Sequence, residues 1–205
     1  MIPFLANIDL AFKNLAPRTS DWQSILPEIA VAGLALFCLL QAMTLPKALR
    51  YLIPTTARIG LALVAIMSVS NAPWTLEPDV ETFGGLLCQD LPIEGVRVVF
   101  LLSALLTSLL ATRFLRDRDA AVADYHHVLL VVTAAFMLLA QSNHFVTFFL
   151  ALETAAVGLY VLVGYLRRSA ASLEAGVKYL VAGGLSSALL LMGIVLVYGA
   201  LGAVP

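Results

Sequence analysis

The sequence predicts an all-α, polytopic membrane protein with six transmembrane helices. Of its 205 residues, 61% are hydrophobic and only 12% are charged, whereas a soluble domain is about half apolar and about a quarter charged. The few charges are clustered, and the uncharged stretches between them approach the ~20 apolar residues that a helix needs to cross a bilayer. These stretches show no strict alternation, which argues against a β-barrel. The composition also argues against a soluble globule and against a disordered chain.

The expected spans follow from the uncharged stretches and from the residues that interrupt them. In order, the spans are 25–45, 53–71, 94–113, 125–142, 145–166 and 173–199. The interruptions are Pro46 with Lys47, a loop over 72–93 rich in proline and glycine, a charged turn over 113–124, a short polar hairpin over 141–144, and Arg167 with Arg168.

The first 24 residues form a separate segment. They begin with an apolar stretch, Met1–Phe12, and lack the charged start and long apolar core of a signal peptide. We expect residues 1–24 to be a short interfacial segment that precedes the first span.

The distribution of basic residues predicts the orientation, because cytoplasmic loops of membrane proteins are enriched in Lys and Arg. Only Lys13 and Arg18 fall on the side of the second and fourth connections. Eight basic residues lie in or directly flank the first, third and fifth connections: Lys47, Arg50, Arg58, Arg113, Arg116, Arg118, Arg167 and Arg168. Both termini should therefore face outward, away from the cytoplasm.

Charge and motifs exclude several classes of function. The net charge is −1, which gives no basic surface for nucleic acid. Cys38 and Cys88 lie far apart and match neither a metal site nor a disulfide framework. The chain has no phosphate-binding glycine loop, zinc-protease motif or nucleophile elbow. We therefore expect no metal, flavin, haem or iron–sulfur cluster in this chain.

Glu153 is an acidic residue deep inside an apolar stretch, ~20 Å from the arginines that end its span. An ionisable group there costs about 3 kcal/mol on insertion scales and usually has a partner and a role. The neighbours on its own helical face, Leu150, Val157 and Tyr160, cannot neutralise a carboxylate. Glu153 is thus a candidate proton carrier, the alternative being a structural ion pair with another subunit.

Lys178 is the second candidate, ~12 Å into the sixth span. Glu174 precedes it by four positions, the favourable order for a helical ion pair. Side chains lean toward the start of their own helix, so Lys178 leans inward and Glu153 outward. With ~8 Å of axial offset as well, we expect no direct contact between them, so a water or another polar side chain would have to bridge them. The alternative for Lys178 is snorkelling to the inner interface.

Other polar residues have plainer interpretations. Arg97, with Glu94 three positions earlier, is expected to be an interfacial anchor, and Glu28 a structural residue at the start of a helix. His126 and His127 fall at the inner mouth of the fourth span, where they could feed protons from the cytoplasm, although a solvated pair is the favoured interpretation. We expect His144 to be exposed or to cap a helix.

Small residues recur at fourfold spacing in the sixth span, a pattern that lets membrane helices approach closely. The pairs are Ala182 with Ser186, Gly183 with Ser187, and Gly184 with Ala188. These pairs predict that the sixth span packs closely against another helix, but they do not identify that helix.

The residues from about 125 to 202 resemble the NADH-quinone oxidoreductase (respiratory complex I) subunit N family, which is related to the large subunits of cation/proton antiporters. The motifs that carry the resemblance are Gln141–Phe145, Phe149–Glu153, Gly158–Tyr165, the Ser-Leu-Glu-Ala-x-x-Lys-Tyr phrase at 172–179, and the small residues up to Gly199. Before residue 125 the resemblance is topological, apart from Leu26-Pro27-Glu28. The resemblance divides the chain into the 1–24 segment, helices one to three over 25–124, and the start of a proton-conducting domain over 125–205.

The resemblance implies that Glu153 and Lys178 belong to a proton pathway, with Glu174, Tyr160, His126 and His127 in supporting positions. It implies a membrane subunit that translocates protons while electrons pass from NADH to quinone. Flavin, iron–sulfur clusters, NADH and quinone would be bound by other subunits. The partners would be other membrane-arm subunits of complex I and the lipid bilayer.

The length departs from the family pattern, since family members have about fourteen helices. The broken seventh helix with its central lysine, and the second inverted repeat, are absent from this sequence. The resemblance therefore implies an incomplete, split or degenerate chain, and a separate chain could supply the missing helices. Two other functions remain open: a subunit of a related cation/proton antiporter or membrane-bound hydrogenase, and a non-conducting structural or assembly subunit.

Overall fold

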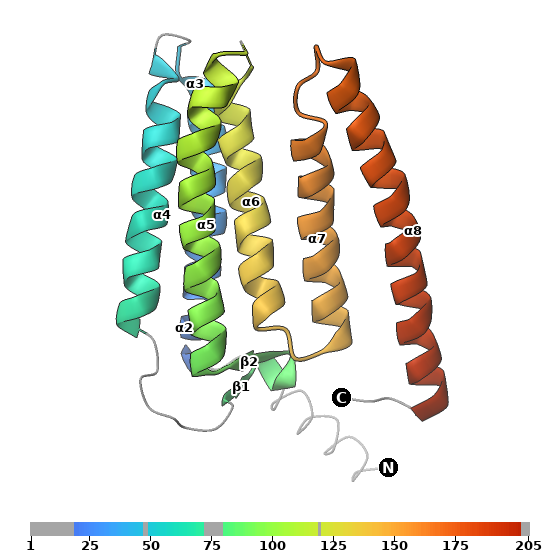
Figure 1. Ribbon diagram of the computed structural model, residues 1–205. Coiled ribbons are helices and arrows are strands. Elements are labelled where there is room, and N and C mark those ends of the chain that lie inside the picture. The colour runs from blue at the N-terminus through green and yellow to red at the C-terminus, as the bar shows by residue number, and fades with distance from the viewer. Residues whose placement is uncertain (1–18, 47–48, 72–79, 119, 202–205) are drawn as a thin grey trace.

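Six long antiparallel helices form the protein, with a small β-hairpin at one end (Figure 1). The computed structural model describes residues 19–46, 49–71, 80–118 and 120–201. The six helices are α3 (Leu26–Thr44), α4 (Leu52–Asn71), α5 (Leu91–Arg116), α6 (Val122–Ala140), α7 (Phe145–Val163) and α8 (Ala170–Leu201). All six are long and apolar enough to cross a membrane. The all-α, six-span prediction is confirmed, and each helix end lies within three residues of its predicted position.

The helix ends follow local chemistry. Pro27 in the first turn of α3 and Pro92 in that of α5 have no N–H to leave unpaired there. The Asp90 carboxylate caps α5 by accepting from the Leu91 N–H at 2.6 Å. His144 caps α7 in the same way through the N–H of Val146, which confirms the predicted capping role.

The 72–93 segment is more ordered than the loop that the sequence predicts. Strands β1 (Val80–Thr82) and β2 (Leu87–Gln89) pair antiparallel around the short helix η2 (Phe83–Gly85), while residues 72–79 lie outside the described residues. The turn adopts positive φ at three successive residues, two of which are the glycines that accept it readily: Phe83, Gly84 and Gly85. The sequence pattern does not indicate the hairpin, because short strands in a long connection leave no apolar pattern.

The hairpin docks onto the turn between α6 and α7. The Cys88 N–H donates to the Gln141 carbonyl at 2.8 Å, and the Asn143 N–H donates to the Leu86 carbonyl at 3.0 Å. The short helix α2 (Thr19–Ser24) lies at the same end of the bundle. We call this the hairpin end. Of the expected interfacial segment over residues 1–24, only α2 belongs to the described residues, and residues 1–18 lie outside them.

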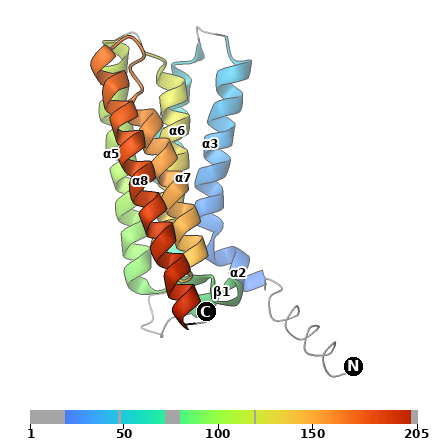
Figure 2. The same ribbon diagram turned by 90° about the vertical axis from the view of Figure 1, so that its right-hand side faces the viewer.

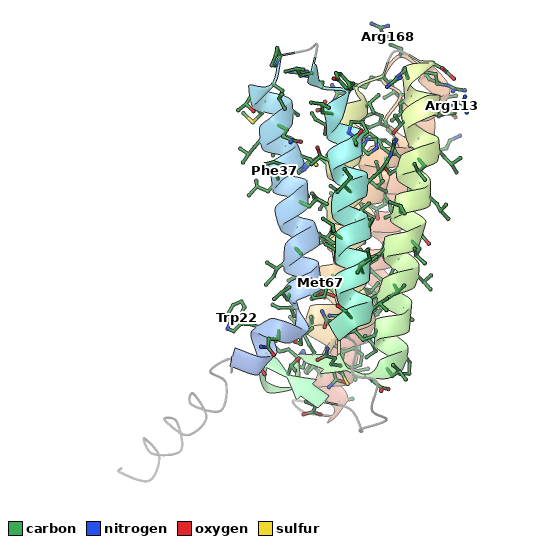
Figure 3. The ribbon with its side chains drawn as sticks, turned by 90° about the vertical axis from the view of Figure 1, so that its left-hand side faces the viewer. Trp22, Phe37, Met67, Arg113 and Arg168 are labelled. Carbon is green, nitrogen blue, oxygen red and sulfur yellow. The ribbon has the colours of Figure 1, made fainter. Side chains whose placement is uncertain are left out.

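The opposite end collects basic side chains, and we call it the arginine end. Figure 3 shows Arg113 and Arg168 there, with Trp22 at the hairpin end. The connections from α3 to α4, from α5 to α6 and from α7 to α8 all lie at the arginine end. The two ends of the bundle therefore differ in charge as the basic-residue pattern predicts.

The interior of the bundle lies among α3, α4, α5 and α6. Its fully buried members are mostly aliphatic and small: Val31, Ala35, Cys38, Ile53, Ala57, Leu61, Leu101, Ala104, Leu130 and Met137. Helix α6 packs against α3, α5 and α7, whereas α8 packs against α7 at the edge of the bundle (Figures 1 and 2). Large apolar residues on the outward faces of the helices would contact lipid.

Candidate functional site

Glu153 occupies the midpoint of α7, the ninth of its nineteen residues. Its side chain is half-buried, and its Oε1 atom is buried without a hydrogen-bond partner among the described residues. The neighbouring Thr154 hydroxyl donates to the Leu150 carbonyl at 2.8 Å. A carboxyl group thus lies at mid-membrane depth with one oxygen unsatisfied, a costly arrangement that marks candidate functional residues in membrane proteins.

Lys178 and Glu174 form the predicted ion pair, with Nζ 2.5 Å from Oε1. Both side chains are exposed, by 74% for Lys178 and 66% for Glu174. They lie on the face of α8 that points away from α7, so no described helix covers them. The expectation that Lys178 does not contact Glu153 is confirmed, because its ammonium group bonds to Glu174 while Glu153 Oε1 has no partner.

The axial distance between Glu153 and Lys178 is larger than the predicted ~8 Å. Gly164 packs against Gly176, and Tyr198 lies 3.2 Å from His144 Nε2. This register places Lys178 level with the last turn of α7, about ten residues or ~15 Å from Glu153. The prediction was too small because the first turns of α8 extend beyond the end of α7.

Tyr160 fills the contact between α7 and α8. A Cβ atom at position 183 would lie 2.1 Å from the Tyr160 Oη atom, so a larger residue there would force the Tyr160 ring to move. The Tyr160 ring also meets Tyr179 edge to face, with centroids 5.0 Å apart. The small-residue pattern of the sixth span is thus explained in part: Gly183 contacts α7, whereas Gly184 faces open space.

His126 is fully buried at the arginine end, so its interpretation as half of a solvated pair was wrong. Its Nδ1 atom lies 2.7 Å from the Val122 carbonyl, and its Nε2 atom lies 3.0 Å from Ser108 Oγ and 3.2 Å from Thr112 Oγ1. Arg58 donates to the same two hydroxyl groups. These contacts join α4, α5 and α6 through one polar cluster.

Two further groups flank this cluster. His127 is half-buried, and its Nδ1 atom lies 2.9 Å from the Ala35 carbonyl of α3. Tyr165 donates to the Ala121 carbonyl, and burial, helped by the nearby Asp124 carboxylate, raises the pKa of Tyr165 to about 12. Tyr165 therefore stays protonated at neutral pH and acts as a hydrogen-bond donor.

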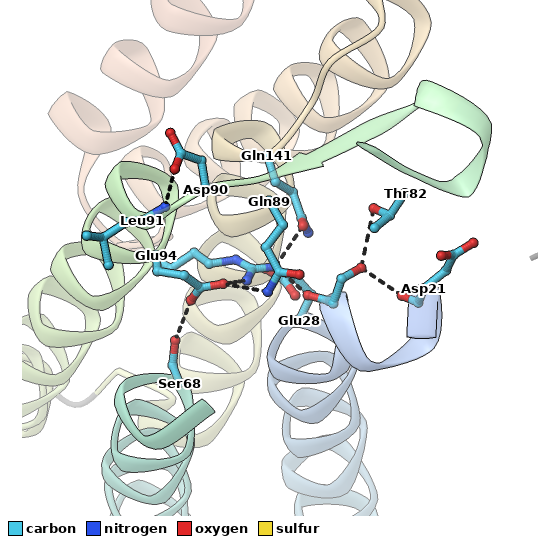
Figure 4. Close-up of polar contacts among 11 residues, drawn as sticks. Asp21, Glu28, Ser68, Thr82, Gln89, Asp90, Leu91, Glu94 and Gln141 are labelled. Atoms are coloured by element: carbon cyan, nitrogen blue, oxygen red, sulfur yellow. Dashed lines mark hydrogen bonds and ion pairs between the residues drawn. The ribbon is translucent and has the colours of Figure 1, made fainter. Parts of the chain in front are cut away.

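A buried ionic cluster lies at the hairpin end, and the sequence interpretation missed it. Arg97 has no exposed surface and lies between Glu28 of α3 and Glu94 of its own helix (Figure 4). Arg97 is therefore not an interfacial anchor, although its predicted pairing with Glu94 is confirmed. The available signal was the presence of opposite charges near the same end of two different spans. Among the described residues, no three His, Cys, Asp or Glu side chains gather as a metal site.

The chain is similar to known membrane proteins over most of its length. A family model described as NADH:quinone oxidoreductase/Mrp antiporter, TM, matches residues 142–205. NADH-quinone oxidoreductase subunit N 1 of Opitutus terrae is 47% identical over 189 residues, which cover 91% of this chain and 37% of that protein. NAD(P)H-quinone oxidoreductase subunit 2 of Synechococcus elongatus is 34% identical over 178 residues, covering 87% of this chain and 34% of that protein.

A solved structure agrees with these sequence matches. A chain of respiratory complex I from Thermus thermophilus with bound aureothin has a TM-score of 0.69 and 25% identity, covering 86% of this chain and 38% of that chain. The predicted resemblance to the subunit N family is confirmed, and it extends well before residue 125. The chain spans little more than a third of the length of the relatives that it matches.

Proposed function

We propose that this chain, as the amino-terminal part of a protein of the NADH-quinone oxidoreductase subunit N family, contributes to proton translocation coupled to electron transfer from NADH to quinone. The observation that carries the proposal is the Glu153 carboxyl group, which lies at the midpoint of α7 with one buried oxygen unpartnered. Residues 1–24 would be an interfacial segment, 25–124 a three-helix support, and 125–205 the start of the conducting domain. Redox cofactors would belong to other subunits.

The proposed roles differ among the site residues. Glu153 would bind and release the transported proton, because a carboxyl group without fixed partners can do both. Lys178, paired with Glu174, would supply a positive charge to the pathway. The position of this charge would depend on which protein covers that face of α8. Tyr160 would position α7 against α8 through its contact with Gly183. A proton-feeding role for His126 and His127 stays a prediction, and their place at the arginine end is compatible with it.

The proposed orientation puts the arginine end in the bacterial cytoplasm and both termini on the periplasmic side, following the enrichment of Lys and Arg in cytoplasmic loops. The exposed face of α8 bears Glu174 and Lys178, and an ion pair facing lipid would be costly. We therefore infer that further helices of the same subunit, or a separate chain, cover this face. Other membrane-arm subunits would be the remaining partners.

The test is Glu153→Gln in the assembled complex, which keeps the shape of the side chain and removes its ability to exchange a proton. We expect fewer protons translocated per NADH oxidised in membrane vesicles, with an unchanged amount of the subunit in the complex. Thr154→Val, one residue away, is the matched control and should translocate normally. Normal translocation by an assembled Glu153→Gln complex would refute the role of this residue.

A related cation/proton antiporter is the second candidate, favoured by the description of the family model that matches residues 142–205. Proteins that co-purify with the chain distinguish the two: redox subunits support the oxidoreductase, and their absence together with antiporter subunits supports the alternative. A purely structural subunit would instead lose assembly in Glu153→Gln without a separate translocation defect.

A further inference from the structure

The ionic cluster at the hairpin end holds two acids and one base away from solvent (Figure 4). The exposed fractions are 6% for Glu28, 4% for Glu94 and 0% for Arg97. If both acids were ionised, the cluster would carry a net charge of −1. A buried charge without compensation destabilises the folded state strongly.

Arg97 forms ion pairs with both acids, but its hydrogen bonds distinguish them. Nη2 carries two hydrogens, and it donates them to the Ser24 carbonyl and to Gln141 Oε1, both at 2.7 Å. Nη1 donates to Glu94. Glu28 Oε1 also lies 2.7 Å from Nη2, yet it accepts no hydrogen bond from it. Arg97 therefore has no hydrogen left on Nη2 for Glu28.

Glu94 and Glu28 differ sharply in the donors around them. Glu94 accepts hydrogen bonds from Arg97, from Ser68 Oγ at 3.1 Å and from Gln89 Nε2 at 3.2 Å. Both oxygens of Glu28 are buried without a hydrogen-bond partner. Donors stabilise an ionised carboxylate, so the negative charge that balances Arg97 belongs on Glu94.

We propose that Glu28 carries a proton at neutral pH, which makes the hairpin end of the bundle a proton-binding site separate from Glu153. The proton gives the cluster zero net charge. Two other acids at this end are engaged elsewhere, since Asp21 accepts from the Phe83 N–H and Asp90 accepts from the Leu91 N–H, and Glu81 of β1 is exposed.

The presence or absence of the proton on Glu28 affects the contacts of the turn between α6 and α7. Without its proton, Glu28 would compete with Gln141 for the hydrogens of Arg97 Nη2. Gln141 is the C-cap residue that follows the last residue of α6, and the hairpin docks onto its carbonyl. Loss of the proton would therefore loosen the contact that holds the start of α7, the helix that carries Glu153.

Infrared spectroscopy of the full chain in lipid nanodiscs at pH 7 tests the proposal. Glu28→Gln should lose one carbonyl-stretch band of a protonated carboxylic acid, whereas Glu94→Gln should lose carboxylate intensity instead. Glu153→Gln identifies any acid band that belongs to Glu153. Loss of carboxylate intensity in Glu28→Gln, with the acid bands unchanged, would overturn the proposal. This readout does not involve proton pumping, so its failure is distinct from failure of the proposed function.

Thermal unfolding of the same variants gives an independent measurement. Glu28→Gln replaces a neutral acid by a neutral amide and should change the melting temperature by less than ~3 °C, whereas Glu94→Gln leaves Arg97 unbalanced and should lower it by roughly 10 °C or prevent folding. Equal destabilisation by the two variants, or greater destabilisation by Glu28→Gln, would contradict the assignment.

Discussion

Helices α3 to α6 differ from the pair α7 and α8 in how they accommodate polar groups within the membrane. Within the membrane-spanning stretch of α6, 44% of the residues are buried inside the protein, compared with 6% of those in α8. The first region encloses Glu28, Glu94 and Arg97 at the hairpin end and His126 at the arginine end. The second carries Glu153 with an unpartnered oxygen and an exposed ion pair on α8. The enclosed clusters hold helices together, and the exposed ion pair of α8 is available for partners. Unpartnered carboxyl oxygens, which are candidate sites for proton transfer, occur in both regions, at Glu28 and at Glu153.

The polar clusters at the two ends of the bundle hold neighbouring helices together. Arg97 joins α5 to α2 and α6 through the Ser24 carbonyl and Gln141, and His126 joins α6 to α5. Between the ends, contacts are apolar and close, as where Val132 of α6 would meet a Cβ atom at Gly158 at 2.3 Å. No comparable charged cluster joins α8 to the rest of the described residues, so α8 depends on close packing against α7.

Removal of the Arg97 guanidinium should have the largest effect on stability of all the changes considered. A small effect would contradict the conclusion that enclosed ionic groups hold α3 to α6 together. Arg97→Met leaves Glu94 as a buried charge without its counter-ion, and we expect a loss of about 3–5 kcal/mol in the free energy of unfolding. Arg113→Met, an exposed arginine on the same helix, is the matched control and should change stability by less than about 0.5 kcal/mol. Denaturant unfolding in detergent micelles measures both, and similar values for the two variants would show that the cluster does not stabilise α3 to α6.

A methyl group at position 183 should have an intermediate effect, located at the contact between α7 and α8. Gly183→Ala forces the Tyr160 ring to move, since the added Cβ would lie 2.7 Å from its Cζ atom as well as close to Oη. Overpacking of this kind costs about 1–3 kcal/mol. Gly184→Ala, which meets nothing within 4 Å, provides the control for helix propensity. The difference in the free energy of unfolding between the two variants measures how much the close contact of α8 with Tyr160 contributes to stability. A difference near zero would mean that the Tyr160 contact is dispensable.

The sequence predicts most of the fold because the membrane imposes a simple rule on it. Long apolar stretches between clustered charges locate all six helices, and the basic residues locate one end of the bundle. The hairpin over residues 80–89 was missed because strand pairing in a connecting segment leaves no apolar pattern. The i,i+4 pair of Glu174 with Lys178 was predictable, since one helix determines it.

Contacts between helices were the part that could not be predicted. Arg97 looked like an interfacial anchor because its partner Glu28 lies 69 positions earlier in the sequence, and only the packing of α3 against its neighbours brings the two together. His126 looked solvated because its place near the end of a span says nothing about the hydroxyl groups that α5 brings to it. Glu153 was recognisable from its own apolar surroundings, but its offset from Lys178 required the register of α7 against α8.

Breaking the exposed ion pair should have the smallest effect on the isolated chain. Glu174→Gln removes a pair whose side chains are 66% and 74% exposed, and solvent screening limits such pairs to about 0–1 kcal/mol. In a larger assembly whose helices cover this face of α8, the same variant leaves Lys178 buried without its partner and should cost more. Thermal unfolding of the variant, measured once in the isolated chain and once in the assembled complex, therefore reports whether protein covers the face. The same small change in both settings would indicate that α8 keeps this face toward solvent or lipid headgroups, and that Lys178 lies outside any proton pathway enclosed by protein.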